Sequence, residues 1–438
     1  MILRTNPCGS PLLGELTPPG DKSISHRALI LSCLARGQSR VQGLLDAADV
    51  RATADACRQL GMQMRTGPDG ALLLDGVGAD GLSTPAGPLD MGNSGTAMRL
   101  LAGVLAAQPF SSELTGDASL SRRPMRRIVQ PLTMMGAVIE TAENARPPLR
   151  IRGNPALTGI DYVSPVASAQ VKSCLLLAGL YAAGRTTVTE PRLSRDHTEK
   201  MLPSFGVELL GTCGVRGGSR LSAASIRVPA DISSAAFFLA AACLVPGSDL
   251  LLRDVGLNAT RDGVIDTLRA MGAKIDVGNR RLFGEEPVGD LHVRYAGRLQ
   301  GIDIPVERVP ALIDELPVIM ALAAACEGCT RLRGAAELRV KESDRLAVMA
   351  AGLSAMGVSL REYEDGIDIE GGPIHAADVN GAGDHRCAMS FCVLGQVAPG
   401  PLRVAGAEHI GTSYPGFVAD LTSVGGAVRE LRGIQGHA

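Results

Sequence analysis

Six stretches rich in alanine and leucine recur along the chain, and small polar residues or aspartate precede each of them. Their apolar positions cover almost the whole helix circumference, which predicts helices buried against sheets and against one another. A short strand-like run follows each stretch. The predicted helices cover residues 23–36, 94–108, 168–183, 231–245, 314–326 and 385–398. The strand-like runs cover residues 39–44, 112–115, 186–189, 250–254, 330–332 and 402–405.

A second helical pattern ends each time in an apolar residue and a glycine, which suits the left-handed conformation common at helix C-termini. The recurring glycines are Gly61, Gly136, Gly206, Gly272, Gly357 and Gly426. Their spacing of about 66 to 85 residues divides the chain into six copies of one strand–helix–strand–helix–strand unit. We predict an α/β fold in which two domains each hold three units around buried helices. A run of unrelated α/β units is the alternative.

Two proline-bearing segments, residues 17–20 and 227–230, each lie just ahead of a new helix. We expect the chain to cross between the two domains at these segments. Two halves joined by two strands predict a cleft that can close around a ligand.

The composition excludes several classes of function. Of 438 residues, 45% are hydrophobic and 20% are charged, which is typical of a globular protein rather than a disordered one. A net charge of −2 and an aromatic content of 3% argue against a nucleic-acid partner. The apolar run at 235–245 is too short to span a bilayer, and the first residues lack a signal-peptide pattern. We therefore expect a cytoplasmic protein with no membrane partner.

The ten cysteines are scattered, many of them in apolar runs, as in proteins of a reducing compartment. Cys326 and Cys329 form a C-x-x-C pattern with no second pair at zinc spacing. We interpret this pattern as a helix end and expect no metal site.

Basic and hydroxyl-bearing residues gather where helices are predicted to begin. Exposed backbone N–H groups and the helix dipole favour an anion at such positions. Each cluster alone is also explained as a solvated helix start or, for Asp314, as a helix N-cap. Together they predict a small ligand with two anionic groups, beside which the carboxylates of Asp314 and Glu342 are candidates for proton transfer. The cations are Lys22, Arg27, Arg99, Arg123, Arg195, Lys341, Arg345 and Arg386.

Four motifs carry a resemblance that covers essentially the whole chain. They are PGDKSISHR at 19–27, LDMGNSGTAMR at 89–99, RVKESDRL at 339–346 and DHRCAM at 384–389. At these residues the chain resembles the enolpyruvyl transferase family, and within it the EPSP synthases of the shikimate pathway. The resemblance implies two domains of three βαβαββ units, one with residues 1–20 and 230–438 and the other with residues 21–229.

The resemblance also implies an activity. Members of the EPSP synthase branch transfer the enolpyruvyl group of phosphoenolpyruvate to the 5-hydroxyl of shikimate 3-phosphate, and phosphate leaves. The expected partners are these two small molecules, acting on a monomer with no metal and no organic cofactor. Glyphosate, a family inhibitor, occupies the phosphoenolpyruvate site, which by resemblance includes Gly95.

Individual roles follow by resemblance at matching positions. Asp314 is expected to accept the 5-hydroxyl proton, and Lys22 or Glu342 to protonate the enol carbon. Shikimate 3-phosphate is expected to bind Lys22, Ser23, Arg27, Ser168, Ala169, Gln170, Arg195, Asp314 and Lys341. Phosphoenolpyruvate is expected to bind Lys22, Gly95, Arg123, Gln170, Arg345 and Arg386.

The chain departs from the family pattern in places. Many members carry a lysine just before a Ser/Thr–aromatic–Pro segment, whereas residues 411–415 read GTSYP. Ala169 stands where some relatives have serine, and Leu100 where some have proline. One alternative is a UDP-N-acetylglucosamine enolpyruvyl transferase, but the loop at 116–124 lacks the cysteine usual in that family. The other is a non-catalytic anion-binding protein on the same fold.

Overall fold

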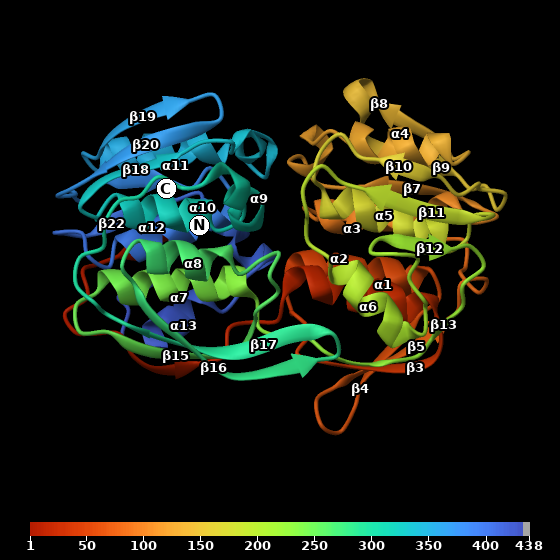
Figure 1. Ribbon diagram of the computed structural model, residues 1–438, viewed down its shortest axis with the longest axis horizontal. Coiled ribbons are helices and arrows are strands. Elements are labelled where there is room, and N and C mark those ends of the chain that lie inside the picture. The colour runs from red at the N-terminus through yellow and green to blue at the C-terminus, as the bar shows by residue number, and fades with distance from the viewer. Residues whose placement is uncertain (432–438) are drawn as a thin grey trace, which may run out of the picture. The chain divides into compact units, whose positions relative to one another are not determined.

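The computed structural model describes residues 1–431, which divide into two compact units. Unit 1 contains Met1–Pro19, Ala230–Arg281 and the residues from Pro287 onward. Unit 2 contains Gly20–Pro229 and the short segment Leu282–Glu286. In Figure 1 the colour bar helps to distinguish them, because most red to yellow-green segments form unit 2, whereas unit 1 contains most green to blue segments and the red N-terminal residues 1–19.

Unit 2 is built on three buried helices that contact one another, α1 (Lys22–Leu34), α3 (Gly95–Ala106) and α5 (Ala169–Gly179). Three sheets surround them, in the orders β13-β3-β5-β4 with β14 also on β3, β6-β7-β9-β8 and β10-β11-β12. The outer helices are α2 (Ala48–Gln59), α4 (Arg126–Met134) and α6 (His197–Met201). The strands are β3 (Ala35–Gln42), β4 (Gln63–Thr66), β5 (Leu72–Val77), β6 (Leu89–Asp90), β7 (Ser111–Thr115), β8 (Val138–Ala142), β9 (Arg146–Arg152), β10 (Asp161–Val163), β11 (Arg185–Thr189), β12 (Gly214–Arg216), β13 (Leu221–Ser222) and β14 (Ser225–Arg227).

Unit 1 repeats this plan around α7 (Ile232–Leu244), α10 (Leu316–Ala323) and α12 (His385–Leu394). Figure 1 shows these helices inside, with strands such as β15 and β16 on one side and β18 to β20 on the other. The sheet orders are β16-β17-β15-β2, β18-β20-β19 and β21-β22-β1-β23. The further helices are α8 (Gly263–Ala270), α9 (Val309–Leu312), α11 (Arg345–Ala355) and α13 (Phe417–Ser423). The strands are β1 (Ile2–Thr5), β2 (Leu13–Leu16), β15 (Asp249–Gly256), β16 (Lys274–Phe283), β17 (Glu286–Arg294), β18 (Gly328–Leu332), β19 (Ser359–Tyr363), β20 (Gly366–Gly371), β21 (Asp378–Asn380), β22 (Leu402–Ala405) and β23 (Val428–Leu431).

The six alanine- and leucine-rich helices of the sequence pattern are all present, and each ends one to four residues earlier than predicted. They are nearly all-round apolar because they lie inside, where every face meets another helix or a sheet. The strand-like runs are likewise present as β3, β7, β11, β15, β18 and β22. The predicted α/β class is confirmed.

A left-handed glycine ends the outer helical segments, as predicted, at five of the six expected positions, although Gly206 caps the 3-10 helix Leu202–Phe205 that directly follows α6. The exception is the last copy, where Gly425 at φ 104° takes that conformation in place of Gly426. The others are Gly61 (φ 109°), Gly136 (φ 98°), Gly206 (φ 82°), Gly272 (φ 102°) and Gly357 (φ 81°). A side chain at any of these positions would be strained.

The repeat is clearest in the continuous run β6–α3–β7–α4–β8–β9, which is one βαβαββ unit. Two other copies take their first strand from a distant part of the chain. Strand β2 precedes α1 in sequence but pairs in parallel with β15, and β14 precedes α7 but pairs in parallel with β3. The first strand of each of these two copies is therefore supplied near a point where the chain passes from one unit to the other.

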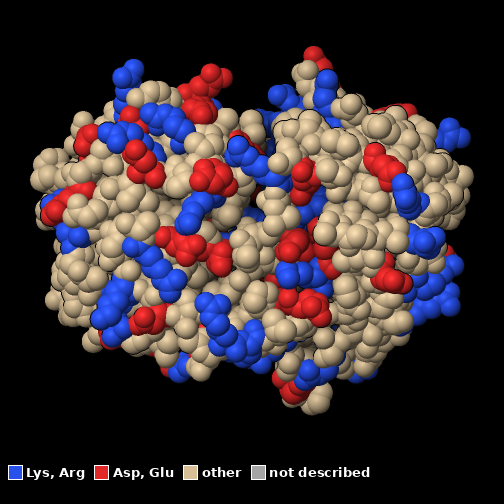
Figure 2. All heavy atoms as spheres, viewed as in Figure 1, with Lys and Arg blue, Asp and Glu red and all other residues tan. Residues whose placement is uncertain are grey.

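The charges on the visible surface are mixed. Figure 2 shows lysines and arginines interspersed with aspartates and glutamates, in keeping with the net charge of −2. No helix within residues 1–431 has both the length and the apolar character needed to cross a membrane.

Candidate functional site

The starts of the three buried helices of unit 2 lie together. Arg99 on the first turn of α3 donates from Nη1 to Gln170 Oε1 on α5 at 2.6 Å. Gln170 Nε2 donates back to Thr96 Oγ1 on α3 at 3.0 Å. Arg27 on α1 reaches Ser173 Oγ on α5 at 2.6 Å. Three helix N-termini therefore bring their backbone N–H groups and dipoles to one place, which favours an anion there.

Arg27 is held almost without solvent contact by neutral groups. Its Nε donates to Thr198 Oγ1 at 2.7 Å, and its Nη1 donates to the carbonyl of Ser23 at 2.9 Å. Burial is the main influence on this side chain and lowers the pKa of Arg27 to about 10. The hydrogen-bond acceptors named here are neutral, so none of them neutralises the guanidinium, which stays able to attract a bound anion.

Lys22 opens α1 and forms an ion pair with Asp49 on α2. Asp21 caps the same helix, since its Oδ1 accepts from Ile24 N at 2.8 Å. His26 is fully buried on this helix, with Nδ1 2.7 Å from Thr53 Oγ1. Burial first, and then the charges of Lys22 and Arg27, hold the pKa of His26 well below its usual 6.5. His26 is therefore neutral, and the cationic character of this helix start comes from its neighbours.

Arg123 lies at the edge of the same cluster. Its Nη2 donates to Asn93 Oδ1 at 2.5 Å and to Ser119 Oγ at 3.4 Å. Gly95 lies between two guanidinium groups, because a Cβ placed there would be 2.7 Å from Arg99 Nη1 and 3.3 Å from Arg123 Nη1. The absence of a side chain at Gly95 thus lets both arginines approach the start of α3.

Other predicted site residues of unit 2 lie on segments beside this cluster. Ser168 caps α5, where Ala169 is the first helical residue. The Ser168 N–H donates to Glu190 Oε1 at 2.7 Å. Arg195 is half-buried just ahead of α6. Unit 2 thus brings together the predicted residues of α1, α3 and α5.

Unit 1 brings a different set of charges together around Arg345, which is 1% exposed. Its Nε lies 2.8 Å from Asp384 Oδ2, its Nη1 3.2 Å from Asp314 Oδ1, and its Nη2 2.5 Å from Glu342 Oε2. Burial lowers the pKa of this guanidinium, but the three carboxylates outweigh burial and raise it well above its usual value. Arg345 thus fixes the positions of both carboxylates that are candidates for proton transfer, Asp314 and Glu342.

Arg386 shares Asp314 with Arg345. Its Nη1 donates to the main-chain carbonyl of Asp314 at 3.0 Å, and its Nε lies 3.7 Å from Asp314 Oδ1. Lys341 pairs with Glu337 at 2.8 Å. Thr412 occupies the sequence position at which many family members carry a lysine. It lies near the start of α12, with its Oγ1 3.5 Å from His385 Nδ1.

The two clusters differ in charge. In unit 2, four cations (Lys22, Arg27, Arg99 and Arg123) gather near the helix starts, and Lys22 pairs with Asp49, whereas in unit 1 three carboxylates surround the buried guanidinium of Arg345. The first arrangement suits an anionic ligand and the second suits proton transfer.

Several residues in these clusters had no role assigned from the sequence. Asn93 orients Arg123, and Asp384 accepts from Arg345 Nε and from the Arg386 N–H at 2.9 Å. Both lie inside the motifs GNSG and DHR, so the motifs pointed to them without giving a role. Ser173 had no sequence signal, and Thr198 had only its place at a predicted helix start, because their contacts with Arg27 depend on α5 and α6 meeting α1.

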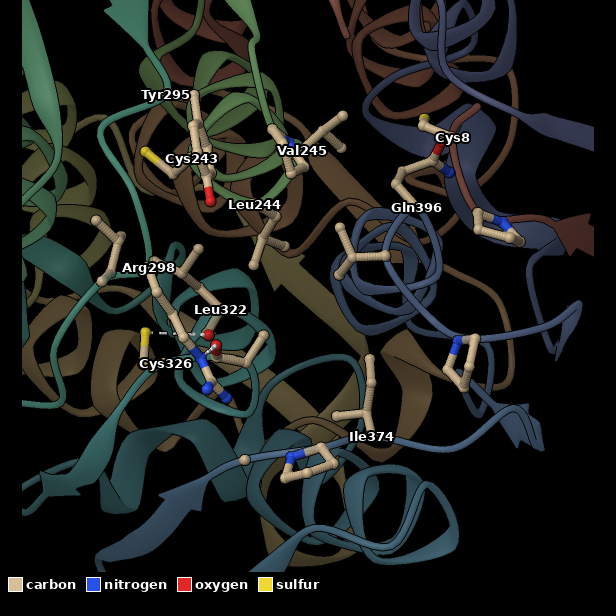
Figure 3. Close-up of a pocket in the computed structure, with 18 residues that line it drawn as sticks. Cys8, Cys243, Leu244, Val245, Tyr295, Arg298, Leu322, Cys326, Ile374 and Gln396 are labelled. Carbon is tan, nitrogen blue, oxygen red and sulfur yellow. Dashed lines mark hydrogen bonds between the residues drawn. The ribbon is translucent and has the colours of Figure 1, made fainter. Parts of the chain in front are cut away.

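A pocket of about 550 Å³ in unit 1 lies elsewhere. Figure 3 shows it near the C-terminal ends of α7 and α10, lined by Leu244, Tyr295, Arg298 and Cys326. None of the predicted site residues lines it. Across residues 1–431, no group of three or more His, Cys, Asp or Glu side chains is arranged to hold a metal ion. The ten cysteines are all in the free thiol form.

Comparison with known proteins gives a consistent result. The family model described as EPSP synthase (3-phosphoshikimate 1-carboxyvinyltransferase) matches residues 8–421. A 3-phosphoshikimate 1-carboxyvinyltransferase from Xanthomonas campestris pv. campestris (strain B100) is 54% identical over 412 residues, or 93% of this chain and 94% of the relative. One from Xylella fastidiosa (strain Temecula1 / ATCC 700964) is 52% identical over 420 residues, or 95% of this chain and 92% of the relative.

Solved structures agree with the sequence comparison. The 2.37 Å structure of EPSP synthase from Acinetobacter baumannii superposes with a TM-score of 0.87 at 46% identity. The match covers 98% of this chain and 99% of that chain. The two-domain fold expected from the repeat and from the resemblance is thereby confirmed.

Proposed function

The chain belongs to the EPSP synthase (3-phosphoshikimate 1-carboxyvinyltransferase) family, and we propose how its residues perform that family's reaction. The reaction transfers the enolpyruvyl group of phosphoenolpyruvate to the 5-hydroxyl of shikimate 3-phosphate and releases phosphate. It belongs to the shikimate pathway of aromatic amino acid biosynthesis. The observation that carries the proposal is the gathering of Arg27, Arg99 and Gln170 at three helix N-termini of unit 2.

The anionic groups of both substrates need cations of fixed position. We assign shikimate 3-phosphate to the helix starts that carry Lys22, Ser23, Arg27, Ser168, Ala169, Gln170 and Arg195, with Asp314 and Lys341 from unit 1. We assign phosphoenolpyruvate to Lys22, Gly95, Arg123, Gln170, Arg345 and Arg386. Arginine suits this purpose because its planar guanidinium binds carboxylate or phosphate through two parallel hydrogen bonds.

Proton transfer falls to the carboxylates and the lysine. The oxygen of the 5-hydroxyl attacks C2 of phosphoenolpyruvate while Asp314 accepts the hydroxyl proton. The enol CH₂ carbon takes a proton from Lys22 or Glu342. The product is a tetrahedral adduct that still carries phosphate. The C–O bond to phosphate then breaks, the methyl carbon loses a proton, and the enol ether forms. Arg345 and Arg386 keep Asp314 in place throughout, because both hold it before substrate arrives.

The test is a phosphate-release assay on the purified chain. We expect release only when shikimate 3-phosphate and phosphoenolpyruvate are both present, and no release when UDP-N-acetylglucosamine replaces shikimate 3-phosphate. Release with the UDP-sugar would favour the other enolpyruvyl transferase family. Binding of both substrates without turnover would favour an anion-binding protein on the same fold.

A further inference from the structure

A buried ion cluster in unit 2 connects two segments of the proposed shikimate 3-phosphate site. Lys172 on α5 is 2% exposed, and its Nζ lies 3.0 Å from Glu190 Oε2 and 2.8 Å from Glu199 Oε1. Burial lowers the pKa of Lys172, but the two carboxylates outweigh burial and raise it, so the ammonium stays charged. Lys172 is one of only five lysines in the sequence, yet it is buried and is not among the residues expected to bind a substrate.

Glu190 is the member of this cluster that reaches the proposed site. Its Oε1 accepts from the N–H of Ser168 at 2.7 Å, and Ser168 caps α5. Its two carboxylate oxygens also accept from the Ser194 hydroxyl at 2.7 and 2.8 Å, and Oε2 accepts from the Ser194 N–H at 3.3 Å. Lys172 completes the connection, because its Nζ lies 3.5 Å from the Ser194 carbonyl.

The two serines are close in sequence to residues that carry proposed roles. Ser168 directly precedes Ala169 and Gln170, and Ser194 directly precedes Arg195. The segment that ends at Ser194 follows β11 as a loop, so its position depends on side-chain contacts rather than on a sheet. Glu190 supplies those contacts, because it accepts hydrogen bonds from both the hydroxyl and the N–H of Ser194.

We propose that Glu190, held by Lys172, is a positioning residue that fixes the α5 start and the Ser194–Arg195 segment for binding of shikimate 3-phosphate. The inference rests on the proposed function. Glu190 touches no reacting atom, and its effect passes through Ser168 and Ser194. Three charge-assisted hydrogen bonds to one buried carboxylate give a more rigid geometry than neutral contacts would.

The chain offers a matched pair of variants. Glu190→Gln and Glu199→Gln each remove one buried carboxylate from Lys172 and leave one behind, so Lys172 keeps a single carboxylate partner in both. Within residues 1–431, Glu199 makes no hydrogen bond to Ser168 or Ser194, whereas Glu190 bonds both. A difference between the variants therefore reports positioning rather than the loss of a buried charge.

The experiment measures steady-state kinetics, thermal unfolding and calorimetric binding of shikimate 3-phosphate alone. We expect Glu190→Gln to raise the KM and the dissociation constant for shikimate 3-phosphate by about ten-fold or more, with kcat and the KM for phosphoenolpyruvate within about two-fold. We expect Glu199→Gln to leave the shikimate 3-phosphate constants within about two-fold. The unfolding temperature identifies any variant that fails to fold.

Two results would overturn the inference. One is an equal rise in the shikimate 3-phosphate constants for both variants, and the other is no rise for a folded Glu190→Gln. Failure of the proposed function would differ from both, because the unmodified chain would then release no phosphate from the two substrates.

Discussion

Asp314 is held from two directions by arginine: its Oδ1 lies 3.2 Å from Nη1 of Arg345, and its main-chain carbonyl accepts from Arg386. The carboxylate that we propose as the proton acceptor therefore has a fixed orientation in the absence of substrate. A preoriented base loses little conformational freedom when the substrate hydroxyl arrives.

Asp314→Asn tests this role. The amide keeps the size of the side chain but cannot accept a proton, and general bases typically contribute about 100- to 10,000-fold to a rate. We expect kcat for phosphate release to fall by about 100-fold or more, with smaller changes in both KM values. Asp303→Asn is the control, because Asp303 is an exposed residue paired with Arg331. A kcat within a few-fold of the unmodified value for Asp314→Asn would remove Asp314 from the chemistry.

Arg123→Ala is expected to affect phosphoenolpyruvate more than shikimate 3-phosphate. Removing one partner of a buried charge pair typically costs about 3–5 kcal/mol, which predicts a rise of about 100-fold or more in the KM for phosphoenolpyruvate. The neighbouring Arg122 is exposed, so Arg122→Ala is a matched control in the same loop. Separate KM measurements for the two substrates decide the matter. Equal losses for both substrates would contradict the assignment of Arg123.

Gly95→Ala is expected to weaken inhibition by glyphosate. The added methyl would lie 2.7 Å from Arg99 Nη1 and 3.3 Å from Arg123 Nη1, so both guanidinium ends must shift. The inhibition constant is measured against phosphoenolpyruvate. Gly87→Ala serves as the control, since a Cβ at Gly87 meets nothing within 4 Å. An unchanged inhibition constant for Gly95→Ala would show that Gly95 does not border the inhibitor.

The sequence predicted the architecture well because the repeat imposes the same constraint six times. Each buried helix is apolar on nearly every face, and each outer helix ends at a glycine with positive φ, so both features are visible in the order of residues. The last copy shows where the pattern becomes ambiguous. Two adjacent glycines, Gly425 and Gly426, satisfy the sequence pattern equally, and only the backbone geometry shows that Gly425 has φ 104°.

The sites were less predictable for a physical reason. A residue type at a helix start can be read from the sequence, but a hydrogen-bond partner on another helix cannot. Arg27 was therefore identified, whereas Thr198 and Ser173, which hold it from α6 and α5, were not. The same holds for Glu190, whose importance depends on Ser168 and Ser194 meeting at one carboxylate. The proposed substrate roles remain predictions that the variants above test.

His26 predicts a pH dependence of stability. Its pKa in the folded protein is held well below 6.5, so below pH 6.5 the unfolded chain binds a proton that the folded chain does not. Stability from this group is fully present above pH 6.5 and is lost as the pH falls, by at most about 1.4 kcal/mol per pH unit. Denaturant unfolding between about pH 5 and pH 8 should show a flatter profile for His26→Asn than for the unmodified chain. Parallel profiles would mean that His26 becomes protonated in the folded state.

Fosfomycin separates the two enolpyruvyl transferase families by their loops. It inactivates the UDP-sugar family by alkylating a loop cysteine, which must be exposed and thiolate-forming to react. Here the loop at 116–124 offers Asp117, Ser119 and Ser121 instead. The cysteines nearest to this loop in sequence are Cys57 and Cys174, and both are buried. The hydrogen bond with Cys33 is the largest cause that raises the pKa of Cys57, and burial raises that of Cys174 to about 12.

We therefore expect the chain to remain active and unmodified after incubation with excess fosfomycin. Intact-mass analysis and the phosphate-release assay on the same sample give the two readouts. A UDP-N-acetylglucosamine enolpyruvyl transferase treated in parallel shows that the reagent is active. A stoichiometric adduct with loss of activity would contradict the interpretation of this loop. An unmodified, active chain agrees with direct attack by the substrate hydroxyl, since no thiol is then needed and Asp314 suffices to accept the proton.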